Sequence, residues 1–225
     1  PIEITDLNEN IFPNAIVVCD TVNEILKATT TAVNPLYQWY FNNVLITGAT
    51  ADTFNATQAG NYSVKVSSPN FDCVASDGIS ISVATLNLVS PVEMTICSPT
   101  VSSVFDLTSM QSQITTTTGA TFMFYNTLVD AQSESSNFIT TPSTYNSASS
   151  IIYALVKAGP CVKIATINLN VILIPTIITQ PINKLVCIGN SKTFSVTAIN
   201  DVGYQWQVNL GNGFVDLIDN ANYSG

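Results

Sequence analysis

The amino-acid sequence predicts an all-β protein that consists of sandwich domains joined in tandem, with the last one incomplete. Three observations support this prediction. Only 9% of the residues are charged, and Thr, Ser and Asn, which favour strands and turns, supply much of the polar surface. Short segments alternate apolar and polar residues, which is the period of a half-buried strand. The tripeptide Tyr-Gln-Trp occurs at 37–39 and again at 204–206, and these two copies contain both tryptophans of the chain.

The composition excludes several classes of function. The chain has no His, all six of its basic residues are Lys, and its formal net charge is −9. Without His it lacks the commonest general base and metal ligand, so His-dependent catalytic triads and zinc sites are excluded. The negative charge makes nucleic acid and anionic membranes poor partners. We therefore expect a non-catalytic protein without a cofactor. The best apolar run, Val171–Ile174, ends at Pro175 and is too short for membrane insertion.

The first domain is expected over residues 1–84. Tyr37, Trp39 and Phe41 share one face of a strand, so Trp39 is predicted to be a core residue rather than a ligand contact. Residues 60–66 follow a glycine turn and place Tyr62 on the inner face of another strand, and 78–83 alternate as a closing strand. Short strands with a Trp in one and a Tyr in a later one indicate an immunoglobulin-like sandwich.

Residues 176–225 repeat the first half of that domain. Cys187 lies 19 residues before Trp206, much as Cys19 lies 20 residues before Trp39. The segment 194–198 alternates as a strand, and Trp206 is also predicted to be a core residue. No equivalent of the strands at 60–66 and 78–83 follows. This region is therefore interpreted as the N-terminal half of a third immunoglobulin-like domain, and the chain as an internal piece of a larger protein.

Residues 85–175 are predicted to form a second, divergent sandwich. They keep the order of the first domain, with Cys97 early, Phe124 in an aromatic strand, then Tyr153 in a strand that is followed by Cys161. The last segment, 165–174, alternates again.

The five cysteines predict disulfides. The sequence has no Cys-x-x-Cys pair, which argues against zinc-knuckle and thioredoxin-like sites. The spacing suits one bridge in each complete domain, Cys19–Cys73 and Cys97–Cys161, and such bridges imply an oxidising compartment. The alternative is that these cysteines are free buried thiols. Cys187 is expected to be unpaired within these residues, and whether it pairs beyond residue 225 is left open.

Few side chains suggest a binding or catalytic site. Asp216 and Asp219 could offer oxygen ligands to Ca²⁺, but turn residues beside a strand are the simpler interpretation, so no metal is assigned. Asp106 and Asp130 have no visible partner, which argues against a paired-carboxylate hydrolase. Tyr40, together with Tyr125, is expected to point outward, where an aromatic ring could stack on a sugar.

Residues 15–84 contain the pattern Cys … YxW … IxGAT … GxYxVxV … Cys. This pattern, together with residues 181–225, resembles the immunoglobulin-like and PKD-like repeats of secreted surface proteins of Bacteroidetes. The chain departs from antibody domains at Val64, where a second core cysteine would stand. Residues 85–175, with FDLT … YNTLVDAQ … IYALV … C, resemble repeats of large flavobacterial surface adhesins, including those of gliding motility.

The resemblance implies an extracellular segment of a cell-surface adhesin or stalk that gives reach and multivalent attachment. It implies type IX secretion, and glycosylation of Thr21 within Asp-Thr-Val, although a plain surface loop explains that motif equally well. Expected partners are an unknown surface or polysaccharide ligand, neighbouring repeats of the same chain, and secretion or outer-membrane anchoring proteins. The alternatives are a carbohydrate-binding module and an accessory stalk of a secreted enzyme.

Overall fold

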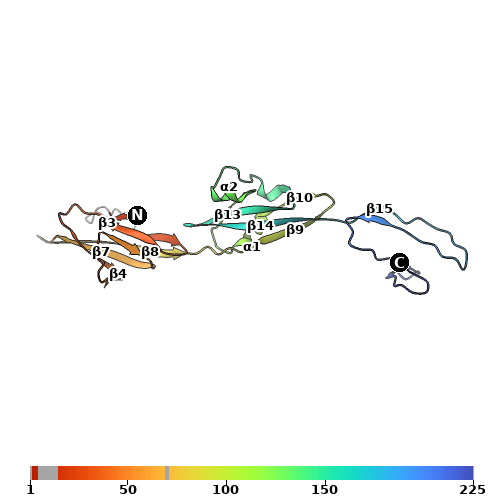
Figure 1. Cartoon of the computed structure of the whole chain (residues 1–225), viewed down its shortest axis with the longest axis horizontal. Helices are drawn as coiled ribbons and strands as arrows, with labels where there is room; N and C mark the ends of the chain where they lie inside the picture. The colour runs from red at the N-terminus through yellow and green to blue at the C-terminus, as the bar shows by residue number, and fades with distance from the viewer. Residues whose placement is uncertain (1, 5–14, 69–70, 225) are drawn as a thin grey trace. The chain divides into compact units, whose positions relative to one another are not determined.

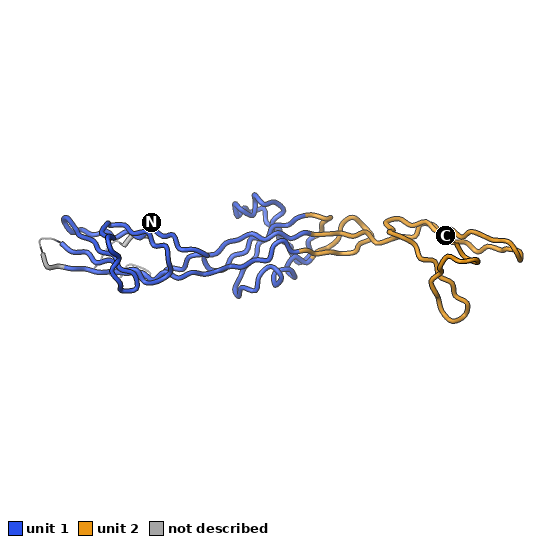
Figure 2. The backbone as a smooth tube through the Cα atoms, turned by 60° about the horizontal axis from the view of Figure 1, so that its bottom comes forward, with its two compact units in different colours: residues 1–92, 106–145, 151–168 blue, residues 93–105, 146–150, 169–225 orange. Residues whose placement is uncertain are grey.

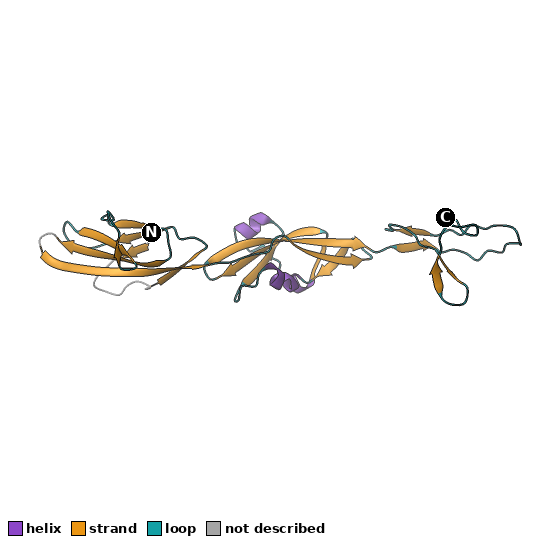
Figure 3. Cartoon of the chain, turned by 90° about the horizontal axis from the view of Figure 1, so that it is seen from below, coloured by secondary structure: helices purple, strands orange, loops and turns teal. Residues whose placement is uncertain are grey.

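The computed structural model describes residues 2–4, 15–68 and 71–224, with side chains described over 15–68 and 74–224. Strands dominate the chain and the helices are short, as Figure 3 shows. The chain forms two compact units, coloured separately in Figure 2. Unit 1 contains residues 1–92, 106–145 and 151–168, and unit 2 contains residues 93–105, 146–150 and 169–225. This division follows different boundaries from the predicted domains 1–84, 85–175 and 176–225, which stay a prediction.

The first domain has the two sheets of an immunoglobulin-like sandwich (Figure 1). The five strands of one sheet are, in spatial order, β2 (Ala15–Cys19), β8 (Phe71–Ala84), β7 (Gly60–Ser68), β4 (Leu36–Phe41) and β5 (Val44–Leu45). The other sheet contains β1 (Ile2–Ile4), β3 (Glu24–Ala28) and β6 (Thr53–Ala56). The all-β, immunoglobulin-like prediction is therefore confirmed.

The core of this domain lies between the two sheets and contains the residues that the alternation predicts. Trp39 and Val64 are fully buried, and Tyr62 is buried with them. The indole Nε1 of Trp39 donates a hydrogen bond of 2.9 Å to the carbonyl of Ala51. The Tyr62 hydroxyl donates to the carbonyl of Gln58 at 2.9 Å, the tyrosine corner of immunoglobulin-like folds.

The glutamine of the repeated Tyr-Gln-Trp tripeptide closes a hairpin. The side-chain Nε2 of Gln38 donates to the carbonyl of the following tryptophan at 3.0 Å and to that of Ile46, across the hairpin, at 2.9 Å. In the second copy Gln205 makes the same two bonds, to its tryptophan at 2.9 Å and to Leu217 at 3.0 Å. The repeat therefore preserves a hairpin as well as a tryptophan.

The middle region combines a sheet with short helices. Its four-stranded sheet has the order β11 (Thr121–Tyr125), β13 (Ser150–Ala158), β14 (Cys161–Leu173) and β9 (Val92–Ser98), and a separate pair is β10 (Ser102–Phe105) with β12 (Tyr145–Ala148). The helical segments are η1 (Leu107–Met110), α1 (Gln111–Ile114), α2 (Leu128–Gln132) and η2 (Pro142–Thr144). Helices lie on both sides of the sheet in Figure 3. Consecutive residues of β13, such as Ala154, Leu155 and Val156, are accordingly all buried.

Tyr125 corrects one prediction. It was expected to point outward, but it is fully buried against Ala131 of α2 and Leu155 of β13. Its neighbour Phe124 is buried as well, because both faces of β11 are covered. Burial raises the pKa of the Tyr125 hydroxyl, and the nearby Glu134 carboxylate raises it further.

Residues 176–224 form two small antiparallel pairs, β15 (Thr176–Thr179) with β16 (Thr197–Ile199) and β17 (Gln207–Asn209) with β18 (Phe214–Asp216). The prediction that Trp206 is a core residue is wrong for this structure, since its side chain is 37% exposed while Trp39 is 0% exposed. The reason is that these pairs enclose no core, since the buried hydrophobic residues of the described part of the chain end at Leu169. Phe194, predicted in a strand, is also exposed.

Within the described residues, no helix combines the length and the apolar character that crossing a bilayer requires.

Candidate functional site

The most distinctive site of the chain starts where two strands of the first domain end together. β2 pairs in parallel with β8, and the register places Cys19, the last residue of β2, beside Ala84, the last residue of β8. The next backbone N–H, that of Asp20, donates to the carbonyl of Ala84 at 2.9 Å. Both strand ends are therefore fixed at one point of the domain.

A hairpin of the middle region supplies the other half of the site. β13 and β14 are joined by Gly159 and Pro160, and Gly159 has a φ of 55°, a left-handed conformation that glycine adopts without steric cost. Cys161 follows this turn as the first residue of β14, and its side chain is 0% exposed.

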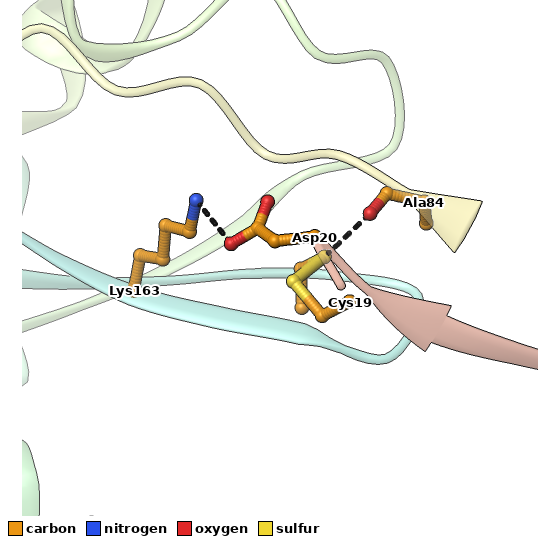
Figure 4. The surroundings of a disulfide bond; sticks show 5 residues. Cys19, Asp20, Ala84 and Lys163 are labelled. Atoms are coloured by element: carbon orange, nitrogen blue, oxygen red, sulfur yellow. Dashed lines mark hydrogen bonds and ion pairs between the residues drawn. A yellow bond between two sulfur atoms is a disulfide. The ribbon is translucent and has the colours of Figure 1, made fainter. Parts of the chain in front are cut away.

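A disulfide joins Cys19 to Cys161 (Figure 4). The Cα atoms of the two residues are 5.0 Å apart although 142 positions separate them in the sequence. The sulfur of Cys161 also lies 3.5 Å from the carbonyl oxygen of Ala84. Because an oxidised sulfur carries no proton, we interpret this approach as a packing contact. The bond thus connects the end of the first domain to the hairpin of the middle region.

An ion pair lies beside the disulfide. The carboxylate Oδ2 of Asp20 is 2.7 Å from the Nζ of Lys163, as the dashed line in Figure 4 shows. Asp20 has a φ of 58°, a left-handed conformation that Asp tolerates better than most residues. The side chains are 42% and 34% exposed, and ion pairs this open contribute about 0–1 kcal/mol. The pair therefore adds little to stability beside the covalent bond.

The linker after Ala84 is held on the middle region by its own contacts. Leu86 is fully buried, and the carbonyl of Asn87 accepts a hydrogen bond of 2.8 Å from the Thr115 hydroxyl. The hydroxyl oxygen of Ser90 accepts from the backbone N–H of Thr166, in β14, at 2.9 Å. The first sandwich and the middle region, which meet here within unit 1, are thus connected twice, through an anchored peptide linker and through the disulfide.

Both predicted disulfides, Cys19–Cys73 and Cys97–Cys161, are wrong, because Cys19 and Cys161 bond to each other. β8 runs from Phe71 to Ala84, so Cys73 and the residue beside Cys19 lie near opposite ends of one strand. At about 3.3 Å per residue, this places the Cys73 backbone roughly 35 Å away. Cys97 is exposed on β9 and free, and Cys187 is exposed and has no disulfide partner within the described residues.

The residues that the structure brings together as potential metal ligands are not the predicted ones. Cys19, Asp20 and Cys161 bring potential ligand atoms within 4.8 Å of one another, but two of these atoms are the sulfurs of the disulfide, whereas metals bind thiolates. The carboxylate of Asp216 accepts a hydrogen bond of 2.8 Å from Gln207 on the paired strand. Calcium binding at Asp216 and Asp219 stays an untested prediction.

The other acidic candidates stabilise local structure. Asp106 caps η1 by accepting a hydrogen bond of 3.0 Å from the N–H of Thr108. Asp130 accepts bonds from the hydroxyl of Ser135 at 2.7 Å and the amide of Asn137 at 3.2 Å. Hydrogen bonds from Thr127, Ser135 and Asn137 lower the pKa of Asp130.

Two surface candidates have different surroundings. The ammonium of Lys65 lies 5.1 Å from the ring centre of the partly exposed Tyr40, a cation–π arrangement that occupies one face of the ring. Thr21 is exposed directly after the Cys19–Asp20 corner, so its hydroxyl is accessible. Its glycosylation is not tested by the geometry.

Comparison with protein families connects the disulfide to a known type of domain. Residues 93–175 match a family described as a Flavobacterium inter-domain disulphide bond domain, and this similarity supports a flavobacterial origin. Cys161 lies inside the matched range and its partner Cys19 lies outside it. Among curated proteins, none matches the chain.

Several solved structures are similar to the chain. A titin fragment, domains I67–I69 in a variant with Glu-to-Ala changes, is 13% identical with a TM-score of 0.39, and the match covers 74% of this chain and 66% of that one. The three N-terminal domains of the outer capsid protein Hoc of bacteriophage RB49 are 12% identical, with a TM-score of 0.42 and coverages of 72% and 68%. Extracellular domains 3–5 of Drosophila OTK are 12% identical, with a TM-score of 0.31 and coverages of 82% and 72%.

Proposed function

We propose that the chain is a non-catalytic segment of a large, secreted cell-surface adhesin or stalk, of the type that serves attachment or gliding. In this role it holds binding regions away from the cell and contributes repeated, weak contacts that add through multivalency. The observation that carries the proposal is the Cys19–Cys161 disulfide, which ties the end of one domain to a hairpin of the next.

The disulfide supports a role in reach because it restricts the joint between domains. A single peptide linker allows two domains to rotate about it, and relative motion is the usual expectation for domains in one chain. Here the hydrogen-bonded linker and the disulfide form two connections next to each other. Rotation would have to break the contacts of Leu86 and Asn87 and to strain a covalent bond.

The same bond supports an extracellular location. Disulfides persist in oxidising compartments and are rare in the bacterial cytosol. The similarity to a Flavobacterium inter-domain disulphide domain agrees with this location. Type IX secretion, anchoring at the outer membrane and a polysaccharide or other surface ligand are parts of the proposal that follow from the resemblance of the repeats.

Small-angle X-ray scattering on the full chain tests whether the disulfide restricts motion between the first domain and the middle region. The parent is compared with Cys19→Ser/Cys161→Ser, and Cys97→Ser/Cys187→Ser serves as the matched control because it leaves the disulfide intact. We expect the first variant to show a broader distribution of interatomic distances, and the control to overlay with the parent. Identical curves for all three proteins would refute a role for the bond in stiffening.

The adhesive part is tested on cells of the source bacterium. An antibody against this segment should label intact cells, and deletion of the gene should reduce attachment to a surface or gliding on it. Labelling confined to lysed cells, or unchanged attachment and gliding, would contradict the assignment. A glycan array with the purified chain tests the carbohydrate-binding alternative, for which the buried Tyr125 leaves Tyr40 as the remaining aromatic candidate. A catalytic domain elsewhere in the same gene would favour the enzyme-stalk alternative.

A further inference from the structure

The position of the disulfide in the chain decides which residues respond to a pulling force. Cys19 is near one end of the chain and Cys161 is 142 positions further on, yet their Cα atoms are only 5.0 Å apart. We infer that the bond carries tension past residues 20–160. Force applied at residues 1 and 225 runs through residues 1–19, crosses the two sulfurs, and continues through residues 161–225. The residues between the cysteines form a closed covalent loop that tension on the ends does not stretch.

The loop contains most of the ordered core of unit 1. It includes β3 to β8 of the first domain, with the fully buried Trp39 and Val64, and also α1, α2 and β11 of the middle region. A folded domain resists unfolding through about 5–15 kcal/mol of noncovalent stability. Residues inside the loop are protected from end-to-end tension by the disulfide itself and not by this folding stability. The loop can be extended only if a covalent bond breaks.

Without the bond, the same force would pass from β2 through Asp20 into the remaining strands of the first domain. β2 and β3 belong to different sheets of the sandwich, and Asp20 lies in the segment between them. Tension transmitted from β2 into β3 would therefore pull the two sheets apart and expose the core around Trp39. With the bond intact, tension leaves β2 at its last residue, Cys19, before it reaches β3.

Chain geometry sets the size of the effect. An extended chain spans at most about 3.3–3.6 Å per residue. With the bond intact, the stretchable parts are the 18 steps from residue 1 to 19 and the 64 steps from residue 161 to 225, which reach about 270–295 Å. Without the bond, all 224 steps reach about 740–810 Å. The disulfide therefore reduces the maximum extension of the chain by about 470–510 Å.

This inference concerns the mechanics of the chain and stands independently of its role as an adhesin. Failure of the attachment experiments would leave the force path unchanged. Failure of the force measurement would leave open whether the protein is on the cell surface.

Optical-tweezers stretching of the full chain, held by cysteine-free peptide tags at both ends, tests the inference. The parent under non-reducing conditions is expected to reach a total contour length near 270–295 Å and no more. Cys19→Ser/Cys161→Ser is expected to unfold in further steps, up to about 740–810 Å. Should this variant fail to fold, the parent stretched in a strong dithiol reductant supplies the same comparison, since the gain of about 470–510 Å then appears on reduction of one molecule.

The control is Cys97→Ser/Cys187→Ser, which also loses two cysteines but keeps the Cys19–Cys161 bond. It is expected to match the parent in length and to gain the same length on reduction. An oxidised parent that extends as far as the Cys19→Ser/Cys161→Ser variant would overturn the inference. So would a reductant-dependent gain that is absent from the control, because another cysteine pair would then carry the force.

Discussion

Replacing Trp39 by Ala should destabilise the protein much more than replacing Trp206 by Ala, although both tryptophans belong to a Tyr-Gln-Trp tripeptide. The side chain of Trp39 is 0% exposed, its indole Nε1 donates to Ala51 at 2.9 Å, and its ring stacks on Phe54 at a centroid distance of 5.7 Å. Trp206 has the same sequence neighbours on its N-terminal side but is 37% exposed. Trp206→Ala is therefore a matched control for a change of identical size.

The structure gives different magnitudes for the two substitutions. Removing a fully buried Trp side chain costs about 3–5 kcal/mol, because transfer free energy is lost and a cavity remains. That is a large part of the about 5–15 kcal/mol that stabilises a domain. At about 4–8 °C per kcal/mol, Trp39→Ala should lower the Tm of the first domain by at least about 12 °C. Trp206→Ala should cost less than about 1 kcal/mol, since substitutions at exposed positions have small effects.

Urea unfolding and thermal melts followed by circular dichroism measure both variants against the parent under oxidising conditions. Trp39→Phe gives an intermediate point, because it keeps much of the ring volume and loses the bond to Ala51, which contributes about 0.5–1.5 kcal/mol. Equal losses for Trp39→Ala and Trp206→Ala would refute the reasoning. It would then follow that burial does not distinguish the two tryptophans.

Three further predictions concern single polar side chains. Gln38→Leu should cost about 1–2 kcal/mol, because it removes two hydrogen bonds that close a hairpin, and amide hydrogen exchange at Ile46 should accelerate; unchanged exchange would contradict this role. Asp20→Asn keeps a side chain that tolerates the left-handed backbone, so its melting temperature should fall by the equivalent of at most about 1 kcal/mol and should depend less on salt than that of the parent. Hydrogen bonds hold the pKa of Asp130 below its ordinary 3.8, so the ionised form stabilises the fold above that pH, and this contribution is lost as pH falls through the lowered pKa. NMR shifts around Ser135 should report that titration and should lose it in Asp130→Asn, whereas a midpoint above 3.8 would exclude the hydrogen-bonded geometry.

The sequence predicts the sandwich well where one face of a strand is buried. Alternation then reports burial directly, which is why Trp39 and Tyr62 occupy the core as expected. It fails at Tyr125, because both faces of β11 are covered and no alternation distinguishes inside from outside. It also fails at Trp206, where the strand pattern is present but the described residues 176–224 contribute nothing to the buried hydrophobic core.

The short helices had local signals that strand patterns do not contain. Thr127 and Asp130 are three positions apart, as in a capping box, and the Thr127 hydroxyl accepts from the N–H of Asp130 at 3.1 Å. Asp106 precedes Leu107 and Met110, which are three residues apart and both buried, as on one face of a helix. The N-cap residues Asp106 and Thr127 therefore mark the starts of both helical segments in the sequence.

The disulfide could not be predicted, because cysteine spacing does not determine connectivity. Its pairing depends on the parallel register of β2 with β8, which brings Cys19 to Ala84, and on the turn at Gly159 that presents Cys161. Neither is a property of the sequence around the cysteines themselves.

The separation of Cys19 and Cys161 along the chain has a consequence for biogenesis. Cys161 is buried once the bond has formed, and its partner precedes it by 142 positions of chain. For a chain secreted as proposed above, the bond can therefore form only after residue 161 has followed Cys19 out of the reducing cytosol. Until that moment Cys19 is exposed to wrong pairing with Cys73 and Cys97, which precede Cys161 in the chain. In a secreted chain, the interval between the export of Cys19 and that of Cys161 would thus affect the yield of correctly joined molecules, and slowing export should increase the share of mispaired ones.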